Sequence, residues 1–362
     1  MTGVWHVVGT RPNFPKAAPV LAALSARGVP QRLVHTGQHS DDRLSGQFLR
    51  ELDMQPPDVN LGLGPGSRAE QTAHVLLAFD ALLVEAAAAG RSPDLVVVYG
   101  DVTSTIAAAL ATTQRQIPLA HVEAGLRSFD RTMPEEDNRR VTDAVSTLLF
   151  APSPDAVTNL LHEGIDAGSI HLVGNTMIDS LLAHLPSFDV SAARTTFALA
   201  GRYVVATLHR PGNVDDPVRV AQLVQALHAC ADQVPVLLPA HPRGRRALEA
   251  AGVADHPGVR IIDPIGYTDF HSLVRGASAV VTDSGGVQEE TTVLGVPCLT
   301  IRPNTERPIT ITDGTNRLVT PDSLPGALAE VLRSPPPARS PALWDGHAGE
   351  RIADVITHWF RC

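Results

Sequence analysis

Short apolar runs alternate with helix-forming stretches along the whole chain. In the first half, runs rich in valine, leucine and isoleucine occupy residues 4–8, 32–35, 95–99, 118–122, 148–150 and 170–173, and helices are predicted at residues 70–89 and 102–112. A second set occupies residues 203–207, 236–238, 259–262, 279–281 and 298–300, with helices predicted at 221–230 and 245–251. Strands that are apolar on both faces and alternate with helices predict parallel sheets that are covered on each side.

The two sets of runs predict two domains. A chain of 362 residues is too long for one ordinary core. We therefore predict an α/β protein with two Rossmann-like, doubly wound parallel-sheet domains that face each other across a cleft, one over residues 1–173 and one over residues 174–346. A ligand is expected in that cleft, outside the carboxyl ends of the strands.

Composition narrows the classes of partner. A hydrophobic content of 44% with a net charge of −9 is typical of a globular protein and argues against nucleic acid as the main partner. The cysteines Cys230, Cys298 and Cys362 have no paired or metal-binding spacing, which favours a reducing, cytoplasmic setting. Residues 4–8 are too short for a signal peptide, and no apolar run is long enough to span a membrane, so we expect no membrane partner.

The segment 282–290 has the pattern of a phosphate seat. Ser284, Gly285 and Gly286 follow the apolar run 279–281 and precede a predicted helix, whose first N–H groups and dipole favour an anion. Glu290 lies one turn into that helix and could accept hydrogen bonds from a ribose diol. The alternative is an ordinary strand-turn-helix corner.

Further polar groups follow other strands of the second domain. His209-Arg210 comes just after residues 203–207, and Arg302 and Arg307 follow residues 298–300. With His241-Pro242-Arg243 and the Ser284 turn, these groups predict a phosphate-binding constellation on the second domain. A single histidine in such a place is more often structural than a ligand contact, so each motif is weak alone.

The first domain carries a basic pair and three carboxylates at the ends of its predicted strands. Arg11 and Lys16, which is the only lysine of the chain, follow the first strand, and a compact ammonium differs from the planar guanidinium used elsewhere.

Asp101 follows residues 95–99, Glu123 follows residues 118–122, and Glu135 opens a predicted helix. For Asp101 the alternative is a helix N-cap, and for Glu136 we favour the role of a first-turn carboxylate.

This division suggests a reaction on a nucleoside diphosphate sugar. Loss of the diphosphate from C1 makes the C2 proton removable by a carboxylate, giving neutral 2-acetamidoglucal, and return of the proton to the opposite face inverts C2. No metal or nicotinamide is needed. The sequence has no Gly-x-Gly-x-x-Gly, and Gly62-Leu63-Gly64-Pro65-Gly66 lacks a preceding buried strand, so we predict no cofactor.

Nine segments, in this order, resemble the UDP-N-acetylglucosamine 2-epimerase family, whose members have the two-domain GT-B fold. They are Gly9-Thr10-Arg11-Pro12 with Lys16; Thr36-Gly37-Gln38-His39; Gly100-Asp101; His121-Val122-Glu123-Ala124-Gly125-Leu126-Arg127; Pro134-Glu135-Glu136 with Asn138-Arg139; Gly174-Asn175-Thr176; His209-Arg210; Thr282 to Glu290; and Thr305-Glu306-Arg307-Pro308. The likeness runs from Gly9 to about Val319.

The resemblance assigns roles to individual residues. It implies that Asp101, Glu123 and Glu135 are the catalytic acids and that Lys16 and His209 are further active-site groups. The diphosphate contacts implied are Arg11, Ser284, Gly285, Gly286 and Arg307, with Glu290 at the ribose and Phe270 beside the uracil. It also implies a homodimer and a C-terminal helix, over residues 347–362, that packs back on the first domain.

Three departures from the family pattern stand out. Asn13 occupies a position where the family usually has glutamate, and the usual His-Arg-x-Glu-Asn reads His209-Arg210-Pro211-Gly212-Asn213. Asp41 and the segment around Gly64 do not match the second site at which some bacterial members bind an activating UDP-GlcNAc. The resemblance therefore implies retained catalysis and leaves open both that regulation and the preferred sugar.

The leading hypothesis is a non-hydrolysing epimerase that converts UDP-GlcNAc to UDP-ManNAc. A rival in the same family hydrolyses the intermediate and releases UDP with ManNAc. Two other classes stay open, a GT-B glycosyltransferase with the same donor seat and a catalytically silent nucleotide-sugar binding protein. The paired Glu123 and Glu135 argue against the transferase, and three intact carboxylates that would have no task argue against the binding protein.

Overall fold

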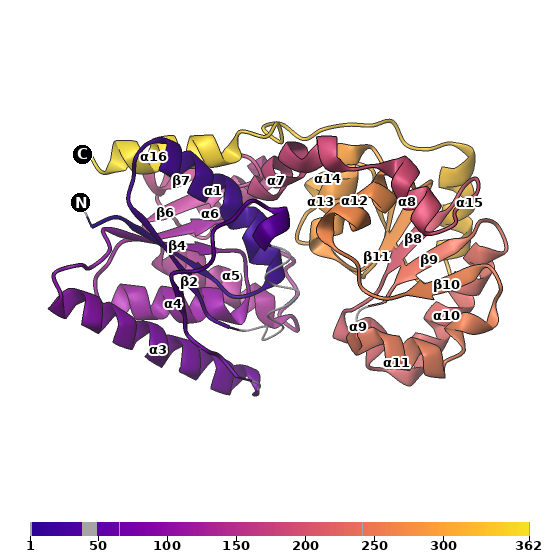
Figure 1. Cartoon of the computed structure of the whole chain (residues 1–362), viewed down its shortest axis with the longest axis horizontal. Coiled ribbons are helices and arrows are strands. Elements are labelled where there is room, and N and C mark those ends of the chain that lie inside the picture. Colours follow the sequence, from indigo (N-terminus) through magenta and orange to yellow (C-terminus); the bar gives the residue numbers. More distant parts are fainter. Residues whose placement is uncertain (1, 38–48, 65, 241, 362) are drawn as a thin grey trace. The chain divides into compact units, whose positions relative to one another are not determined.

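The computed structural model describes residues 2–37, 49–64, 66–240 and 242–361 (Figure 1). Six residues named above lie outside the described residues: Gln38, His39, Asp41, Pro65, His241 and Cys362. By their internal contacts the residues form two compact units, unit 1 with Met1–Ala183 and Ala342–Cys362, and unit 2 with His184–Pro341. The domain borders placed after residues 173 and 346 stay a prediction.

Unit 1 is built on a parallel sheet, in which the described residues form seven strands in the order β3-β2-β1-β4-β5-β6-β7. The strands are β1 (Val4–Val8), β2 (Gln31–His35), β3 (Val59–Asn60), β4 (Leu95–Tyr99), β5 (Leu119–Val122), β6 (Leu148–Ala151) and β7 (Ile170–Leu172). The helices are α1 (Phe14–Ala26), α3 (Arg68–Ala88), α4 (Thr103–Gln114), α5 (Pro134–Val145), α6 (Pro154–His162), α7 (Thr176–His184) and α16 (Ala348–Trp359). Figure 1 shows α1 and α16 on one face of this sheet and α3 and α4 on the other.

Unit 2 repeats the same plan, and its described residues form six parallel strands in the order β10-β9-β8-β11-β12-β13. The strands are β8 (Val204–Thr207), β9 (Val236–Pro239), β10 (Val259–Ile262), β11 (Ala279–Thr282), β12 (Cys298–Ile301) and β13 (Asn316–Val319). The helices are α8 (Val190–Thr196), α9 (Pro211–Val214), α10 (Pro217–Ala231), α11 (Pro242–Ala250), α12 (Tyr267–Gly276), α13 (Gly285–Leu294), α14 (Ile309–Thr312) and α15 (Leu324–Arg333).

The predicted pair of doubly wound parallel sheets is confirmed. The central strands β1, β4, β5 and β6 are buried at every position, as expected where helices cover both faces. The edge strands β3 and β13 were missed, because β3 has only two residues and β13 carries polar Asn316 and Arg317.

Strand order reverses between β1 and β4 in unit 1 and between β8 and β11 in unit 2. The loops that follow these two pairs of strands diverge to opposite faces of their sheets, which is where doubly wound folds bind ligands. The polar residues that follow these strands therefore lie at two defined points, one at the switch point of each sheet.

The expectation that no apolar run is long enough to span a membrane is wrong for one helix of the described ranges. Helix α3 passes that test by length and composition, with a mean hydropathy of 1.3. Its inner face, Val75, Phe79, Leu83 and Ala86, is buried on the unit 1 core. Asp80 pairs with Arg115, which follows α4, at 2.6 Å. These contacts account for α3 as a covering helix of the sheet.

The C-terminal helix α16 is fixed to unit 1 at its start. The N–H of Gly349 donates to Asp179 Oδ2 of α7 at 2.7 Å. A Cβ at Gly349 would lie 2.7 Å from the carbonyl of Pro19 in α1. The two helices therefore pack so closely at this point that only glycine fits. Trp344, in the segment before α16, donates from Nε1 to the Pro152 carbonyl at 3.0 Å.

Asp179→Asn is expected to remove a pH dependence of stability. Burial raises the pKa of the Asp179 carboxyl from 3.8 to about 6, although the Gly349 and Ala348 N–H groups oppose the shift. Because the folded pKa lies above the unfolded one, ionisation destabilises the fold, and this penalty is relieved as the pH falls through about 6. Relative to the variant, the wild type should lose about 1 kcal/mol between pH values of about 5 and about 7. Urea unfolding at both pH values measures this, and a constant difference would contradict it.

Candidate active site

Asn13 connects the two loops at the switch point of unit 1. Its Oδ1 accepts hydrogen bonds from the N–H groups of Gly9 and Thr10, both at 3.0 Å, and its Nδ2 donates to the Tyr99 carbonyl at 2.9 Å. One side chain thus holds the ends of β1 and β4 together. A carboxylate at this position would have no donor for the Tyr99 carbonyl. The departure at Asn13 therefore has a structural use in this chain.

Lys16 and Glu123 form a buried ion pair. Their side chains are 7% and 6% exposed, and they come from the first turn of α1 and from the residue after β5. They meet beside Gly100, where a Cβ would lie 2.8 Å from Lys16 Nζ and 3.0 Å from Glu123 Oε2. Glu123 itself has a φ of 75°, a strained conformation for a residue with a side chain and one that concentrates at functional sites.

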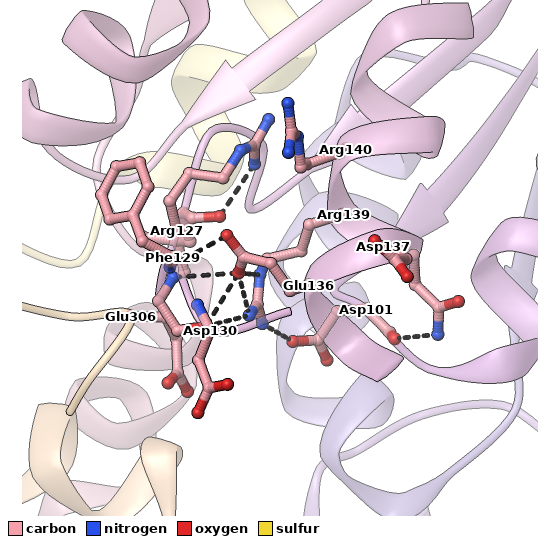
Figure 2. A network of polar contacts seen from close by, with 12 residues as sticks. Asp101, Arg127, Phe129, Asp130, Glu136, Asp137, Arg139, Arg140 and Glu306 are labelled. Carbon is pink, nitrogen blue, oxygen red and sulfur yellow. Dashed lines mark hydrogen bonds and ion pairs between the residues drawn. The ribbon is translucent and has the colours of Figure 1, made fainter. Parts of the chain in front are cut away.

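Asp101 does not cap α4, so that alternative is wrong. The N-cap of α4 is Val102, while the Asp101 carboxylate pairs with Arg139 Nη1 of α5. Asn138 donates from Nδ2 to the Asp101 carbonyl at 2.8 Å, which ties the start of α5 to the loop after β4. Figure 2 shows Arg139 reaching from Glu136 to Asp101.

The adjacent residues Glu135 and Glu136 have different surroundings. Glu136 is buried and accepts hydrogen bonds from the Ser128 N–H at 2.9 Å, the Phe129 N–H at 3.0 Å and Arg139 Nη2 at 2.6 Å. Burial alone would raise its pKa, but the Arg139 and Ser128 donors outweigh burial and hold the pKa below the usual value. Glu135 is half-buried and accepts no hydrogen bond or ion pair from any residue that the structure describes. Glu136 therefore serves the fold, as expected, and Glu135 is available for chemistry.

His121 of β5 is part of a buried charged chain that sequence reasoning did not single out. Its ring lies 2.6 Å from Asp143 Oδ1 through Nδ1 and 2.8 Å from the Gly100 carbonyl through Nε2. Asp143 also pairs with Arg127, at 2.7 Å, and Arg127 pairs with Glu163, at 2.6 Å. This series of contacts supports the Gly100-Asp101 loop through the Gly100 carbonyl. The sequence signal that could have indicated the series is a histidine inside a fully buried strand.

Arg11 lies half-buried in a short 3-10 turn, Arg11–Asn13, directly after β1. With Lys16, Asp101, Glu123 and Glu135 it stands at the carboxyl end of the unit 1 sheet. The structure thus gathers all five predicted residues of this unit at one edge, while their individual roles stay predictions.

Asp283 organises the corresponding edge of unit 2. This fully buried carboxylate, just after β11, accepts the N–H of Arg210 at 2.9 Å and the Nδ2 of Asn213 at 3.1 Å. It also lies 2.9 Å from Nδ1 of His209, whose own N–H donates to it. Burial alone would raise the Asp283 pKa, but His209 and the other donors lower it. Asp283 thus places the proton of the His209 ring on Nδ1, which faces the carboxylate. The Nε2 atom lies on the other edge of the ring, and the side chain is 43% exposed.

The Ser284 turn forms the start of α13, as predicted. Ser284 is the N-cap and Gly285 is the first helical residue. A Cβ on Gly285 would lie 2.6 Å from Arg307 Nη1 and 2.8 Å from Glu306 Oε1, so only glycine lets the arginine approach this helix start. The predicted seat for an anion thus has a helix N-terminus with Gly285, Gly286 and Arg307, and its anion binding stays a prediction.

The cations of this region are held by carboxylates. Arg307 pairs with Glu289 at 2.8 Å and with Glu306, and Arg302 pairs with Glu306 at 2.6 Å. Burial alone would raise the pKa of Glu306, but Arg307 and Arg302 hold it well below the usual value. Arg302 is thus a partner of Glu306 inside the fold, and Arg307 is the arginine that touches the helix start.

Glu290 lies in the second turn of α13 and is 7% exposed. Phe270 lies in α12, half-buried against the core formed by Leu273 and Val287. Both are in unit 2 with the Ser284 turn, as predicted, and their contacts with a nucleotide stay predictions. Among the residues that the structure describes, no group of three or more His, Cys, Asp or Glu side chains could hold a metal ion.

Residues 22–357 match the family model described as UDP-N-acetylglucosamine 2-epimerase. The chain is 37% identical over 364 residues to the UDP-N-acetylglucosamine 2-epimerase of Methanocaldococcus jannaschii, covering 97% of this chain and 98% of the relative. It is 40% identical over 319 residues to the UDP-2,3-diacetamido-2,3-dideoxy-D-glucuronate 2-epimerase of Pseudomonas aeruginosa, covering 86% and 87%.

The fold also matches solved structures. The crystal structure of the Methanocaldococcus jannaschii UDP-GlcNAc 2-epimerase in complex with UDP-GlcNAc and UDP superposes with a TM-score of 0.90 at 36% identity, covering 98% of this chain and 99% of that one.

Proposed function

The chain belongs to the UDP-N-acetylglucosamine 2-epimerase family, and we propose that it interconverts UDP-GlcNAc and UDP-ManNAc without hydrolysis. The observation that carries the proposal is the gathering of Asp101, Glu123 and Glu135 at one edge of the unit 1 sheet, in a chain whose family match spans residues 22–357. Carboxylates at such an edge are suited to moving a proton on a bound sugar.

The proposed reaction is an elimination followed by an addition. A carboxylate takes the C2 proton while the C1–O bond breaks, and its electron pair leaves with UDP, so that a C1=C2 double bond forms in 2-acetamidoglucal. Protonation of C2 from the other face and return of the UDP oxygen to C1 give the epimer.

Asp101, Glu123 and Glu135 are assigned to these proton transfers, and the buried pair with Lys16 holds the Glu123 side chain in place.

The leaving group is a diphosphate, and its charge grows as the C1–O bond breaks. In our proposal the helix start at Ser284, Gly285 and Gly286 stabilises that charge together with Arg307. His209, whose ring is oriented by Asp283, is assigned to the leaving phosphate oxygen.

Incubation with UDP-GlcNAc in heavy water tests this function. We expect the C2 proton signal to disappear from the NMR spectrum while UDP-ManNAc appears, with no accumulation of free UDP. Free UDP with free ManNAc would identify the hydrolysing type, and a spectrum without C2 exchange would identify a transferase or a binding protein. UDP-2,3-diacetamido-2,3-dideoxy-D-glucuronate in a parallel reaction tests the sugar that the Pseudomonas aeruginosa relative is named for.

We further propose that the protein is a cytoplasmic homodimer that pairs through α3. The outer face of α3 is an exposed, uncharged stripe formed by Ala73, Leu77, Ala81, Val84 and Ala88, with Leu77 67% and Val84 43% exposed. Residues at this spacing lie on one side of a helix. Alanines alternating with larger residues suit an isologous contact with the same helix of a second copy.

Leu77→Asp is expected to convert a dimer into a monomer, because two charges would face each other across the two-fold axis. Light scattering after size exclusion measures the mass, and Asp80→Asn on the flank of the stripe is the control. A wild type that is already monomeric, or that co-sediments with anionic vesicles through α3, would contradict the dimer proposal.

A further inference from the structure

The carboxylate assigned to the ribose, Glu290, has one charged partner in the described residues, and it is His271 of the neighbouring helix α12. His271 Nε2 lies 3.0 Å from Glu290 Oε1. The two side chains are 3% and 9% exposed, so the pair is nearly removed from water. The contact is an ion pair by distance, without the geometry of a hydrogen bond. No other residue in the described ranges forms a hydrogen bond or an ion pair with this carboxylate, so Oε2 is left for another donor.

The hydrogen bonding of His271 fixes which nitrogens carry protons. Its Nδ1 lies 2.9 Å from the carbonyl of Tyr267, one turn earlier in α12. A carbonyl only accepts, so Nδ1 is protonated, and the imidazole can present a second proton to Glu290 through Nε2. Burial alone would lower the pKa of His271, but the carboxylate of Glu290 outweighs burial and raises it. Glu290 thus favours the charged form of His271.

Aromatic rings hold the His271 ring in place. Phe188 stacks on it with a centroid distance of 5.3 Å and an angle of 20°, and Tyr267 lies at 4.1 Å. Phe270, assigned to the uracil, meets it edge to face at 5.3 Å. Because three aromatic rings surround the His271 ring, its position is fixed. The ion pair with this fixed ring then holds the Glu290 carboxylate in place.

We propose that His271 is a positioning residue that aims Glu290 at the ribose hydroxyls and so makes the site select ribonucleotides. This inference rests on the proposed function, because it takes UDP as the ligand. A carboxylate fixed by one oxygen presents the other in a single direction, which a vicinal diol can recognise and a deoxysugar cannot. The sequence did not suggest this role, because His271 and Glu290 are separated by a strand and two loops.

The test compares UDP with 2′,3′-dideoxy-UDP by calorimetry. The wild type is expected to bind UDP more tightly by about tenfold or more, the effect of one charge-assisted hydrogen bond. His271→Phe keeps the ring packing but has no donor. It should weaken UDP binding by about tenfold and leave dideoxy-UDP unchanged, so that the selectivity disappears. Because His271 acts through Glu290 in this proposal, the double variant His271→Phe with Glu290→Gln should have the same selectivity for UDP over dideoxy-UDP as Glu290→Gln alone.

The outcomes separate the two proposals. A wild type that does not bind UDP overturns the proposed function and this inference with it. If the wild type binds UDP but His271→Phe keeps its selectivity, or weakens both nucleotides equally, the inference alone is overturned. Should the phenylalanine variant not fold, His271→Gln replaces it, with an expected loss of at least about threefold in selectivity and an unchanged ratio as the contradicting result.

Discussion

Glu135→Gln is expected to slow the turnover of UDP-GlcNAc by about a hundredfold or more, the usual effect of losing a general acid or base. Because Glu135 is half-buried and forms no hydrogen bond or ion pair with a described residue, the amide should fit without a cost in stability. The melting temperature and the affinity for UDP should therefore stay at the wild-type values. Turnover is followed by NMR and UDP affinity by calorimetry.

Two neighbours of Glu135 supply the controls. Asp137→Asn changes an exposed carboxylate of the same helical turn, whose partner is the exposed Arg131, and should leave turnover unchanged. Glu136→Gln should destabilise the fold, since this buried side chain accepts from Ser128, Phe129 and Arg139. If Glu135→Gln retained full turnover, Glu135 would have no place in the mechanism.

Asp283→Asn is expected to lower both activity and stability. The buried carboxylate accepts two backbone N–H groups and the side chains of Asn213 and His209, and an amide must turn its NH2 group toward one of these donors. The free energy of unfolding should fall by about 2–4 kcal/mol, the range for one mismatched partner in a buried charged network. Turnover should fall by about ten- to a hundredfold, because His209 loses its fixed orientation.

A double-mutant cycle separates these two effects of Asp283. If Asp283 acts on catalysis through His209, then Asp283→Asn should slow the His209→Asn enzyme no further, although it still lowers stability. Urea unfolding gives the stability and initial rates give the turnover, with the exposed Asp322→Asn as the matched control. Independent, multiplied losses in turnover would show that Asp283 does not act through His209.

Much of the fold could be predicted because buried parallel strands have a simple signature. Runs such as residues 95–99 are apolar throughout, and polar groups that directly follow them, such as Asp101, must stand at the carboxyl edge of the sheet. The same rule places Glu123, His209 and Ser284. Position along a strand therefore predicts location without any knowledge of contacts.

The partners of those residues could not be predicted, because they depend on how helices return to the sheet. For Asp101 a helix cap was an open alternative, which the sequence could not decide because Arg139 comes to it from α5. Similarly, Arg302 and Arg307 both follow the same strand, and both pair with Glu306. Only the close approach of Arg307 to Gly285 shows which of the two lies at the helix start. The sequence alone does not predict which charged side chains form ion pairs with one another.

The way α16 completes unit 1 has a consequence for biosynthesis. Unit 2 is a continuous segment, His184–Pro341, whereas unit 1 needs the far segment Ala342–Cys362 to cover α1. During synthesis, all of unit 2 is therefore made before the segment that completes unit 1. A nascent chain stalled just after Pro341 should therefore expose the apolar flank of α1 and be a preferred client of chaperones.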